Sequence, residues 1–483
     1  MSGRQNNENE PVRLGRREFL KLGVAGIGAL TIGGLADAGA DAQPGTATVA
    51  GTAPAAPKVP VAPGLHSAPS TLVSSGVPGG ARARSVIQIW LGGGPSHLDT
   101  FDPKPEAGYD YCGPLSKPVS TNVPGIRICE LLPLLAQHAD KYSILRSMTH
   151  PSNGHETAAY IVQTGTLPST DLVYPAIGAV VALKKGSEAG YKGILPPYIT
   201  LTSPLGRFSE AGFLGADYRT FATGGDPNGK VFAVEEMVPP RDTTEQRLRD
   251  RQALLQSLDT LGVGQARDSA LVTTGAYQQK AYQMVLGDAR KAFDLSQEKD
   301  ELRDRYGRNR FGQSCLAARR LVENGVPFIT VNWGGWDNHS DIFPTMKKML
   351  PVLDTGFSTL LDDLSQKGLL DSTIVVCIGE FGRTPKIDWD APWNGGRGHW
   401  CFAFSAVVAG GGFKGGAVVG ASDIRGEYVK ERPVYPWDLT ASIYKLLGID
   451  PMGRLPHPQG CVAYVTPLAA GEVPSGGMLT EIM

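Results

Sequence analysis

Side chains that bind metal ions gather in four short segments of the chain, and each segment lies beside an apolar run typical of a buried strand. Carboxylate and imidazole groups together suit zinc or manganese, with calcium and magnesium as the alternatives. A carboxylate at the end of a buried strand, as expected for Glu380, is costly unless it is paired or bound to a metal. The candidate ligands, which could hold one or two divalent ions, are Asp99, Asp337, His339, Glu380 and His399.

One of these segments, residues 149–160, also has the pattern of a helix start. Asn153 and Glu156 have the three-residue spacing of a capping box, with Asn153 as the N-cap. The positive end of such a helix favours a phosphate or sulfate group. His155 and Thr157 would lie in its first turn, where either could attack an ester or assist the attack. The alternative is an ordinary capped helix without a catalytic role.

Two arginines complete the candidate catalytic group. Arg383 and Arg397 could each grip a tetrahedral anion through a two-pronged guanidinium contact. Arg383 could instead only neutralise Glu380, and Asp99 could only cap a turn. These alternatives remain open at the level of sequence.

The elements that must position these side chains alternate between short apolar strands and helices. We expect a three-layer α/β/α sandwich with a mainly parallel sheet, because such strands are covered by helices on both faces. Sites in these sheets form at the carboxyl ends of the strands. The predicted strands are 86–91, 198–201, 328–332, 373–378 and 402–409, and the predicted helices are 156–163, 175–185, 243–261, 277–306, 313–324 and 343–367.

The N-terminal part of the chain reads as an export signal and a tether. Arg16 and Arg17 precede a short run rich in Gly and Ala with small residues at candidate cleavage sites, so residues 1–42 are predicted to be a signal peptide. Its Arg-Arg-x-Phe-Leu-Lys segment resembles the twin-arginine motif. We therefore expect the twin-arginine translocase as a partner and a periplasmic, extracellular or cell-surface location. The Pro- and Ala-rich residues 43–83 predict a linker.

Composition sets further bounds on function. The formal net charge is −1, so no basic surplus points to nucleic acid. Cys112 and Cys129 lie in loop-like sequence and could pair in an oxidising compartment, whereas the other cysteines do not suggest a disulfide framework. The folded domain is expected at residues 84–470, with a helical insertion at about 242–310 and a C-terminal tail at 471–483.

Five motifs in this domain support a family resemblance. GGGPSHLDTFDPKP, GHETAAY, GGWDNH, GEFGRTP and GRGHW, together with the leader, resemble the domain-of-unknown-function 1501 family, which is described as sulfatase-like. The resemblance implies an alkaline phosphatase-like α/β/α fold and no particular substrate. By motif order, Asp99 is similar to the first-strand metal carboxylate and His399 to the late histidine ligand of that superfamily.

Other residues depart from the superfamily pattern. The Asp337 and His339 pair resembles its aspartate–histidine motif at a closer spacing, and Glu380 stands where an Asp-His pair is usual, so one histidine ligand is missing. His155 occupies the nucleophile position, where the superfamily uses Ser, Thr or a modified Cys. The cysteine motif that formylglycine sulfatases modify is absent from the sequence.

Two hypotheses of function follow. In the first, the protein is an exported metal-dependent hydrolase of phosphate or sulfate esters, acting on a small anionic ester or on a sulfated or phosphorylated polysaccharide. In the second, it is a non-catalytic sulfatase-like protein that binds a surface glycan or a partner protein. The sequence leaves the oligomeric state undetermined.

Overall fold

The structure is a computed structural model that describes residues 81–206, 210–230, 232, 234, 237, 243–262, 279 and 281–483. The predicted signal peptide at 1–42, and the linker at 43–83 except for its last residues, lie outside the described residues. Export and the domain boundaries therefore remain predictions. None of the helices in the described part of the chain has the length and hydrophobicity that crossing a bilayer requires.

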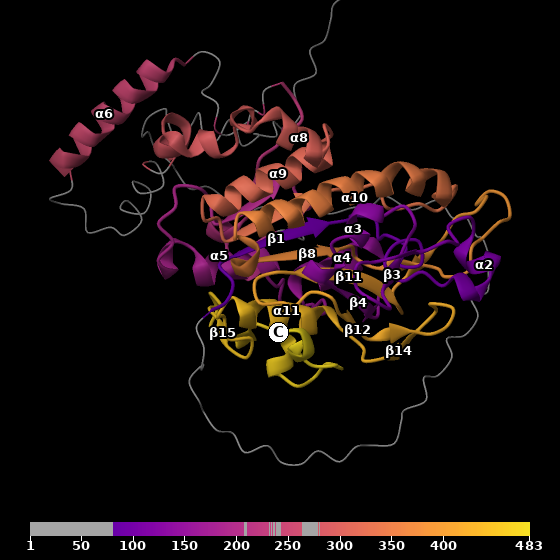
Figure 1. Cartoon of the computed structure of the whole chain (residues 1–483). Coiled ribbons are helices and arrows are strands. Elements are labelled where there is room, and N and C mark those ends of the chain that lie inside the picture. The colour runs from indigo at the N-terminus through magenta and orange to yellow at the C-terminus, as the bar shows by residue number, and fades with distance from the viewer. Residues whose placement is uncertain are drawn as a thin grey trace, which may run out of the picture. The chain divides into compact units, whose positions relative to one another are not determined.

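One large sheet organises the described part of the chain (Figure 1). Its strands, in spatial order, are β12 (Val418–Val419), β4 (Tyr142–Met148), β11 (Phe404–Ala409), β8 (Thr373–Ile378), β1 (Ser85–Trp90), β7 (Phe328–Asn332), β5 (Tyr198–Leu201) and β6 (Phe221–Ala222). Neighbouring strands are parallel, except that β11 runs antiparallel to both β4 and β8. The prediction of a mainly parallel sheet is confirmed.

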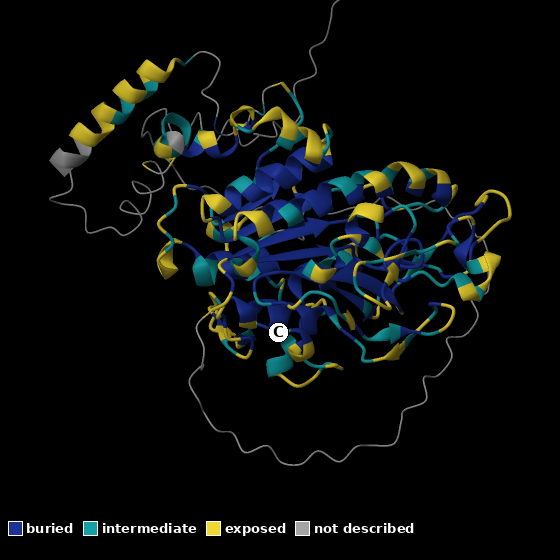
Figure 2. Cartoon of the chain, in the orientation of Figure 1, coloured by how far each residue is buried: buried dark blue, intermediate teal, exposed yellow. Residues whose placement is uncertain are grey.

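Helices cover both faces of this sheet, as the alternation of side chains along β1 shows. Ile87 and Ile89 belong to the apolar core under α9 (Arg310–Glu323) and α10 (Ile342–Gln366). Val86 and Trp90 belong to the core on the other face, with α4 (His155–Thr164), α5 (Ile177–Lys185) and α11 (Pro436–Leu446). Because successive side chains of a strand point to opposite faces, a strand covered on both sides must be apolar throughout. Figure 2 shows the strands buried between the helical layers, so the three-layer sandwich is confirmed.

Three predicted strands, 198–201, 328–332 and 373–378, match β5, β7 and β8 to the residue. Strand β4 was not predicted, because Ser143, Arg146 and Ser147 interrupt its apolar pattern. The structure buries Ser147 and satisfies its hydroxyl through a hydrogen bond to the Arg432 carbonyl oxygen at 2.6 Å. Helix α11 was also missed.

The strand directions explain how the metal-binding segments can meet. Strands β1, β4, β7 and β8 are mutually parallel, so their carboxyl ends lie at one edge of the sheet. Strand β11 runs the other way, and its first residue, Phe404, lies at that same edge. The segments that follow residues 90, 148, 332 and 378 therefore converge with the segment that precedes residue 404.

The region predicted as a helical insertion contains several shorter helices. They are α6 (Glu245–Gly262), a helix that includes residues 281–286, two 3-10 turns (Asp288–Ala292 and Leu295–Gln297) and α8 (Asp300–Tyr306). The prediction of one long helix over 277–306 is wrong, because the chain leaves the helix at Gly287 and turns through both 3-10 segments before α8. Residues 263–278 and 280 lie outside the described residues.

The remaining elements are short and lie in the connections. They are α2 (Tyr109–Cys112), β2 (Val119–Ser120), β3 (Arg127–Ile128), α3 (Pro133–Ala136), β9 (Gly382–Arg383), β10 (His399–Trp400), β13 (Ala421–Ser422), β14 (Val429–Glu431), β15 (Arg454–Leu455) and β16 (Ala463–Tyr464). Cys112 and Cys129 are both buried and unpaired, so the disulfide considered for them is not formed in this structure. Burial raises the pKa of the Cys129 thiol to about 12.

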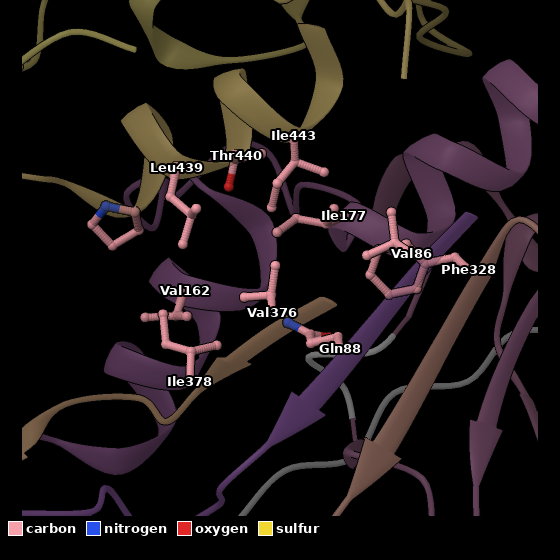
Figure 3. A pocket seen from close by; sticks show the side chains of 11 residues that line it. Val86, Gln88, Val162, Ile177, Phe328, Val376, Ile378, Leu439, Thr440 and Ile443 are labelled. Carbon is pink, nitrogen blue, oxygen red and sulfur yellow. The ribbon is translucent and has the colours of Figure 1, made fainter. Parts of the chain in front are cut away.

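A small space lies between the sheet and helices α4, α5 and α11 (Figure 3). Its lining is almost wholly apolar, with Val86, Phe328 and Ile443 among the labelled side chains. Gln88 also reaches it, but the Gln88 side-chain oxygen accepts a hydrogen bond from the Thr330 hydroxyl. The space is a gap in the packing, and none of the metal-binding candidates lines it.

Candidate metal centre

Four predicted site residues meet at the carboxyl edge of the sheet. His155, Asp337 and His399 offer ligand atoms that all lie within 4.8 Å of one another. His339 adds a further ligand atom, since its Nε2 lies 2.9 Å from His399 Nε2 and 2.9 Å from Asp337 Oδ1. His339 therefore adjoins the three-residue cluster on the side of Asp337 and His399, and we refer to these four residues as the metal centre.

The hydrogen bonds of two histidines leave Nε2 free to face the centre. His399 Nδ1 lies 2.8 Å from the Asn153 carbonyl oxygen, so this nitrogen carries the proton and donates it. His155 Nδ1 lies 2.8 Å from Glu380 Oε1, which fixes the same tautomer. A second partner of this kind orients the imidazole in most protein metal sites. His155 Nε2 lies 3.1 Å from Asp337 Oδ2 but makes no hydrogen bond.

The Glu380 carboxylate links the metal centre to the turn after β1. Its Oε1 accepts hydrogen bonds from His155 Nδ1 and from the backbone N–H of Gly93, the latter at 2.8 Å. Gly93 has φ +114°, and an added Cβ would lie 2.3 Å from the Asp337 nitrogen, so only glycine fits this turn. Glu380 was predicted as a metal ligand, and the structure places its Oε1 against His155, whereas its buried Oε2 has no hydrogen-bond partner among the described residues.

A buried histidine holds the backbone of Glu380 in place. His150 Nε2 donates to the Glu380 carbonyl oxygen at 2.6 Å, and His150 Nδ1 accepts from the Ser152 N–H. Both nitrogens of a neutral imidazole are thereby satisfied. Burial lowers the pKa of His150 to about 4, despite the opposing effect of the Glu380 carbonyl.

Arg383 is part of the framework and has no free face for a substrate. It is fully buried, its Nε donates to the Gly94 carbonyl at 2.8 Å, and its Nη2 donates to Asp337 Oδ1 at 2.6 Å and to the Gly93 carbonyl. Burial opposes the charge of Asp337, but the Arg383 hydrogen bond and charge outweigh it and hold the pKa of Asp337 at about 2. The predicted role of Arg383 in gripping an anion does not agree with these contacts.

The short pairing of β9 with β10 carries His399 to the centre. His399 lies opposite Arg383 in this antiparallel pair. Burial lowers the pKa of His399, whereas the hydrogen bond to Glu380 raises the pKa of His155. His155 therefore favours the protonated form and His399 the neutral form, although the two rings lie in edge-to-face contact with centroids 4.3 Å apart.

Asp99 and Arg397 form a buried pair outside the metal centre. Arg397 Nε donates to Asp99 Oδ2 at 2.8 Å and Arg397 Nη2 to Asp99 Oδ1 at 3.1 Å, and both side chains are fully buried. The remaining guanidinium protons go to the carbonyls of Tyr111, Thr384 and Pro385. Both Asp99 oxygens and all of Arg397 are thus occupied, which disagrees with a metal-ligand role for the first and an anion-binding role for the second.

The helix start at residue 155 differs from its predicted form. Helix α4 begins at His155 after Gly154, and no side chain caps it. The prediction of Asn153 as N-cap is wrong, because its Oδ1 accepts a hydrogen bond from the Cys401 N–H at 2.7 Å. Thr157 is exposed, and no hydrogen bond or ion pair joins it to the metal centre within the described part of the chain.

The roles that Asn153 and His150 have here were not predicted from the sequence. Asn153 binds both His399 and Cys401, and so holds the loop before β11 against the segment after β4. Its partners are more than 240 positions away in the sequence, and one contact uses a backbone oxygen. The only available signal was the concentration of polar residues in 149–160.

The ligand set fits a divalent transition metal. Three imidazole nitrogens and a carboxylate are donors that zinc and manganese accept, and the tautomers of His155 and His399 direct Nε2 inward. The side chains of these four residues are 22–44% exposed, so an ion held there would be reached from solvent. The described residues bring together one such cluster and not two.

The fold and this cluster define an α/β/α protein with a histidine–aspartate centre at the carboxyl edge of its sheet. The chain belongs to the family described as Protein of unknown function (DUF1501), whose model matches residues 83–468. This confirms the family resemblance of the motifs. No curated protein matches the chain in sequence.

The solved structures that the chain resembles include sulfatases and a member of the alkaline phosphatase superfamily. Ps i-CgsB in complex with k-i-k-neocarrahexaose has a TM-score of 0.35 and 12% identity, covering 76% of this chain and 72% of that chain. The PsFucS1 sulfatase from Pseudoalteromonas sp. has a TM-score of 0.34 and 14% identity, covering 76% of this chain and 68% of that chain. A protein in the alkaline phosphatase superfamily from Vibrio parahaemolyticus has a TM-score of 0.34 and 13% identity, covering 77% of this chain and 67% of that chain. Likeness at this level does not bear on metal, substrate or activity.

Proposed function

We propose that the protein is an exported metal-dependent hydrolase of phosphate or sulfate esters. The cluster of His155, Asp337 and His399 at the carboxyl edge of the sheet, with His339 beside the last two, carries this proposal. These four residues would hold one divalent ion, with zinc as the first choice and manganese as the second. When bound, such an ion acts as a Lewis acid that polarises an ester oxygen.

The first turn of α4 supports an anionic substrate. His155 is the first residue of this helix, and its N-cap is Gly154, which has no side chain to cap the helix. The positive end of the helix dipole favours a negative group beside the metal centre. Arg383 and Arg397 are both committed to buried partners, so α4 is the substrate-binding group that we propose in their place.

Water is the nucleophile in this proposal. No hydrogen bond joins a Ser, Thr or Cys side chain to the metal centre in the described ranges, and the predicted nucleophile position holds His155, which serves as a ligand. The role of the protein is then to hold the ion, orient the ester and keep the imidazoles in the required tautomer through Asn153 and Glu380.

Ester hydrolysis with and without a chelator tests the proposal. The mature chain, from about residue 43, would be assayed on p-nitrophenyl phosphate, p-nitrophenyl sulfate and their bis-aryl phosphate analogue. We expect turnover of at least one ester that EDTA removes and zinc or manganese restores. His399→Ala should abolish this turnover and Val462→Ala, an exposed position in another part of the chain, should not. Turnover that persists in both EDTA and His399→Ala contradicts the proposal.

One observation favours the alternative of a non-catalytic binding protein. Arg383 pairs with Asp337 at 2.6 Å and neutralises the carboxylate without any ion. If this pair outcompetes a metal, the centre becomes a polar network that only stabilises the loops. A well-folded protein that takes up no zinc, manganese, calcium or magnesium supports the alternative.

The proposal places the mature protein in the periplasm or at the cell surface. It rests on the twin-arginine motif at Arg16 and Arg17. Replacement of both arginines by lysine should retain the unprocessed precursor in the cytoplasm of a bacterial host. Efficient processing of that variant would argue against twin-arginine export.

A further inference from the structure

The exposed aromatic side chains in the described ranges lie in four segments, which are helix α2, the loop between β9 and β10, the segment after β10 and the turn before β14. These side chains are Tyr109, Trp389, Trp393, Phe402 and Tyr428. Single exposed apolar side chains are common, but exposed aromatic rings that contact one another mark a binding surface. In Figure 1, α2, which begins at Tyr109, and β14, which follows Tyr428, lie at the end of the sheet toward which β1 points. We call these five residues the aromatic rim.

One part of the rim is a stack of rings that rises from the core. Phe343 is buried and stacks on Trp389, with centroids 5.8 Å apart. Trp389 stacks in turn on Tyr109 at 5.2 Å with an angle of only 8° between the planes, and Tyr109 is 62% exposed. The outer ring is therefore a flat face held rigidly by two rings beneath it.

This stack is connected to the metal centre through its own loop. Trp393 lies four residues beyond Trp389, and its ring centroid is 6.0 Å from that of His339. The Ile387 N–H donates to the Asp110 carbonyl, which ties the loop to α2. A molecule lying on Tyr109 and Trp393 would consequently reach the centre.

The other part of the rim adjoins His399. Trp400 follows this ligand directly, and its Nε1 donates to the Glu427 carbonyl at 2.6 Å. The ring centroid of Trp400 lies 4.9 Å from that of Phe402 and 5.7 Å from that of Tyr428. The Phe402 and Tyr428 centroids are 5.7 Å apart, and both residues are more than 40% exposed. Each part of the rim thus borders a different histidine of the metal centre.

We propose that the aromatic rim binds a sugar chain whose neutral rings stack on it while a single anionic ester lies at the metal centre. The proposal deepens the proposed function and rests on it for the role of the ester. Sugar rings have an apolar C–H face that packs on aromatic rings and hydroxyl edges that hydrogen-bond to carboxylates. Such carboxylates flank the stack at Asp388 and Asp390.

The charge of these loops argues against a nucleic acid as the occupant. A polyanion needs lysine and arginine along its path. The loop that contains Trp389 exposes one lysine, Lys386, against two carboxylates, Asp388 and Asp390, and Arg397 in that loop is buried against Asp99. The rim therefore suits a sparsely substituted glycan better than a densely charged polymer.

Affinity electrophoresis through gels with neutral polysaccharides tests the rim without any ester chemistry. The mature chain would be run, in EDTA, through gels that contain dextran, pullulan, xylan, laminarin or galactan. We expect at least one polymer to retard the parent. Tyr109→Ala and Phe402→Ala should each weaken that binding by about fivefold or more, because each removes a stacking surface. The control Val462→Ala, an exposed apolar residue outside the rim, should bind as the parent does.

The outcomes separate this inference from the proposed function. Thermal unfolding and metal content of the rim variants should match the parent, since none of these side chains holds the ion. Failure of all five polymers to retard the parent, or parent-like retardation of both rim variants, overturns the inference. Polymer binding by a protein without ester turnover keeps the inference and rejects the hydrolase. Binding of a protein partner at the rim, blocked by Phe402→Ala in the absence of sugar binding, also overturns it.

Discussion

Removal of the Asp99 carboxylate should destabilise the protein strongly, although Asp99 does not reach the metal centre. Asp99→Ala leaves the Arg397 guanidinium fully buried, with three carbonyl oxygens and no counter-charge. Breaking a buried ion pair from one side costs about 3–5 kcal/mol, because the remaining charge stays desolvated. We expect a loss of that size in the free energy of unfolding.

Urea unfolding of the metal-free mature chain, followed by tryptophan fluorescence, measures this loss. The matched control is Glu106→Ala, because Glu106 pairs with Arg127 at 2.9 Å while both side chains are about half exposed or more. Exposed pairs contribute at most about 1 kcal/mol. The double variant Asp99→Leu/Arg397→Met should recover much of the stability, since it removes both charges and keeps the volume filled.

The same experiment distinguishes a structural role from a ligand role. Arg397 is two residues before His399, so Asp99→Ala should loosen the loop and weaken metal binding along with stability. Asp99→Leu/Arg397→Met should keep most of its metal. A loss below about 1 kcal/mol for Asp99→Ala, or a stable double variant with no metal, would refute the reasoning.

Three further predictions concern the support of the centre. His150 has a pKa of about 4 in the folded protein and 6.5 in the unfolded chain. Its contribution to the free energy of unfolding, about 3 kcal/mol, is therefore fully present above pH 6.5 and is lost as the pH falls toward 4. The variant His150→Gln, which can still donate to the Glu380 carbonyl, should lose this part of the pH dependence in urea unfolding from pH 4 to 8. Gly93→Ala would place a methyl group 2.3 Å from the Asp337 nitrogen and should lower metal affinity at least about tenfold in zinc titrations, and an unchanged affinity would show that this turn is not rigid. Thr157→Ala should retain ester turnover, and its loss would return Thr157 to the nucleophile role.

The strands and the edge of the sheet could be predicted because both follow from local pattern. Continuous apolar runs such as 328–332 and 373–378 are readable where both faces are buried. Strand β4 was not readable, because its serines are satisfied by carbonyls that only the folded chain supplies. The antiparallel direction of β11, which brings His399 to the edge, is likewise a property of the whole topology.

The candidate site was predicted as a set of residues, but the sequence could not divide them into ligands and supports. Asp337, His339 and His399 meet as expected. Asp99 has the same chemistry and a similar position after a strand, yet Arg397 occupies both its oxygens. His155, predicted as an attacking group, lies among the candidate ligands, because Glu380 orients its imidazole. These outcomes depend on side-chain partners hundreds of positions apart, which spacing along one chain does not encode.

The metal content of the purified mature chain tests the central claim most directly. Elemental analysis would be made on protein purified without chelator, beside His339→Ala, the double variant Asp337→Ala/His399→Ala and the control Val462→Ala. We predict about one equivalent of zinc or manganese in the parent and the control, less in His339→Ala, and none in the double variant. A parent that stays free of metal after incubation with both ions, or a double variant that keeps its metal while folded, would contradict a metal centre built from these residues.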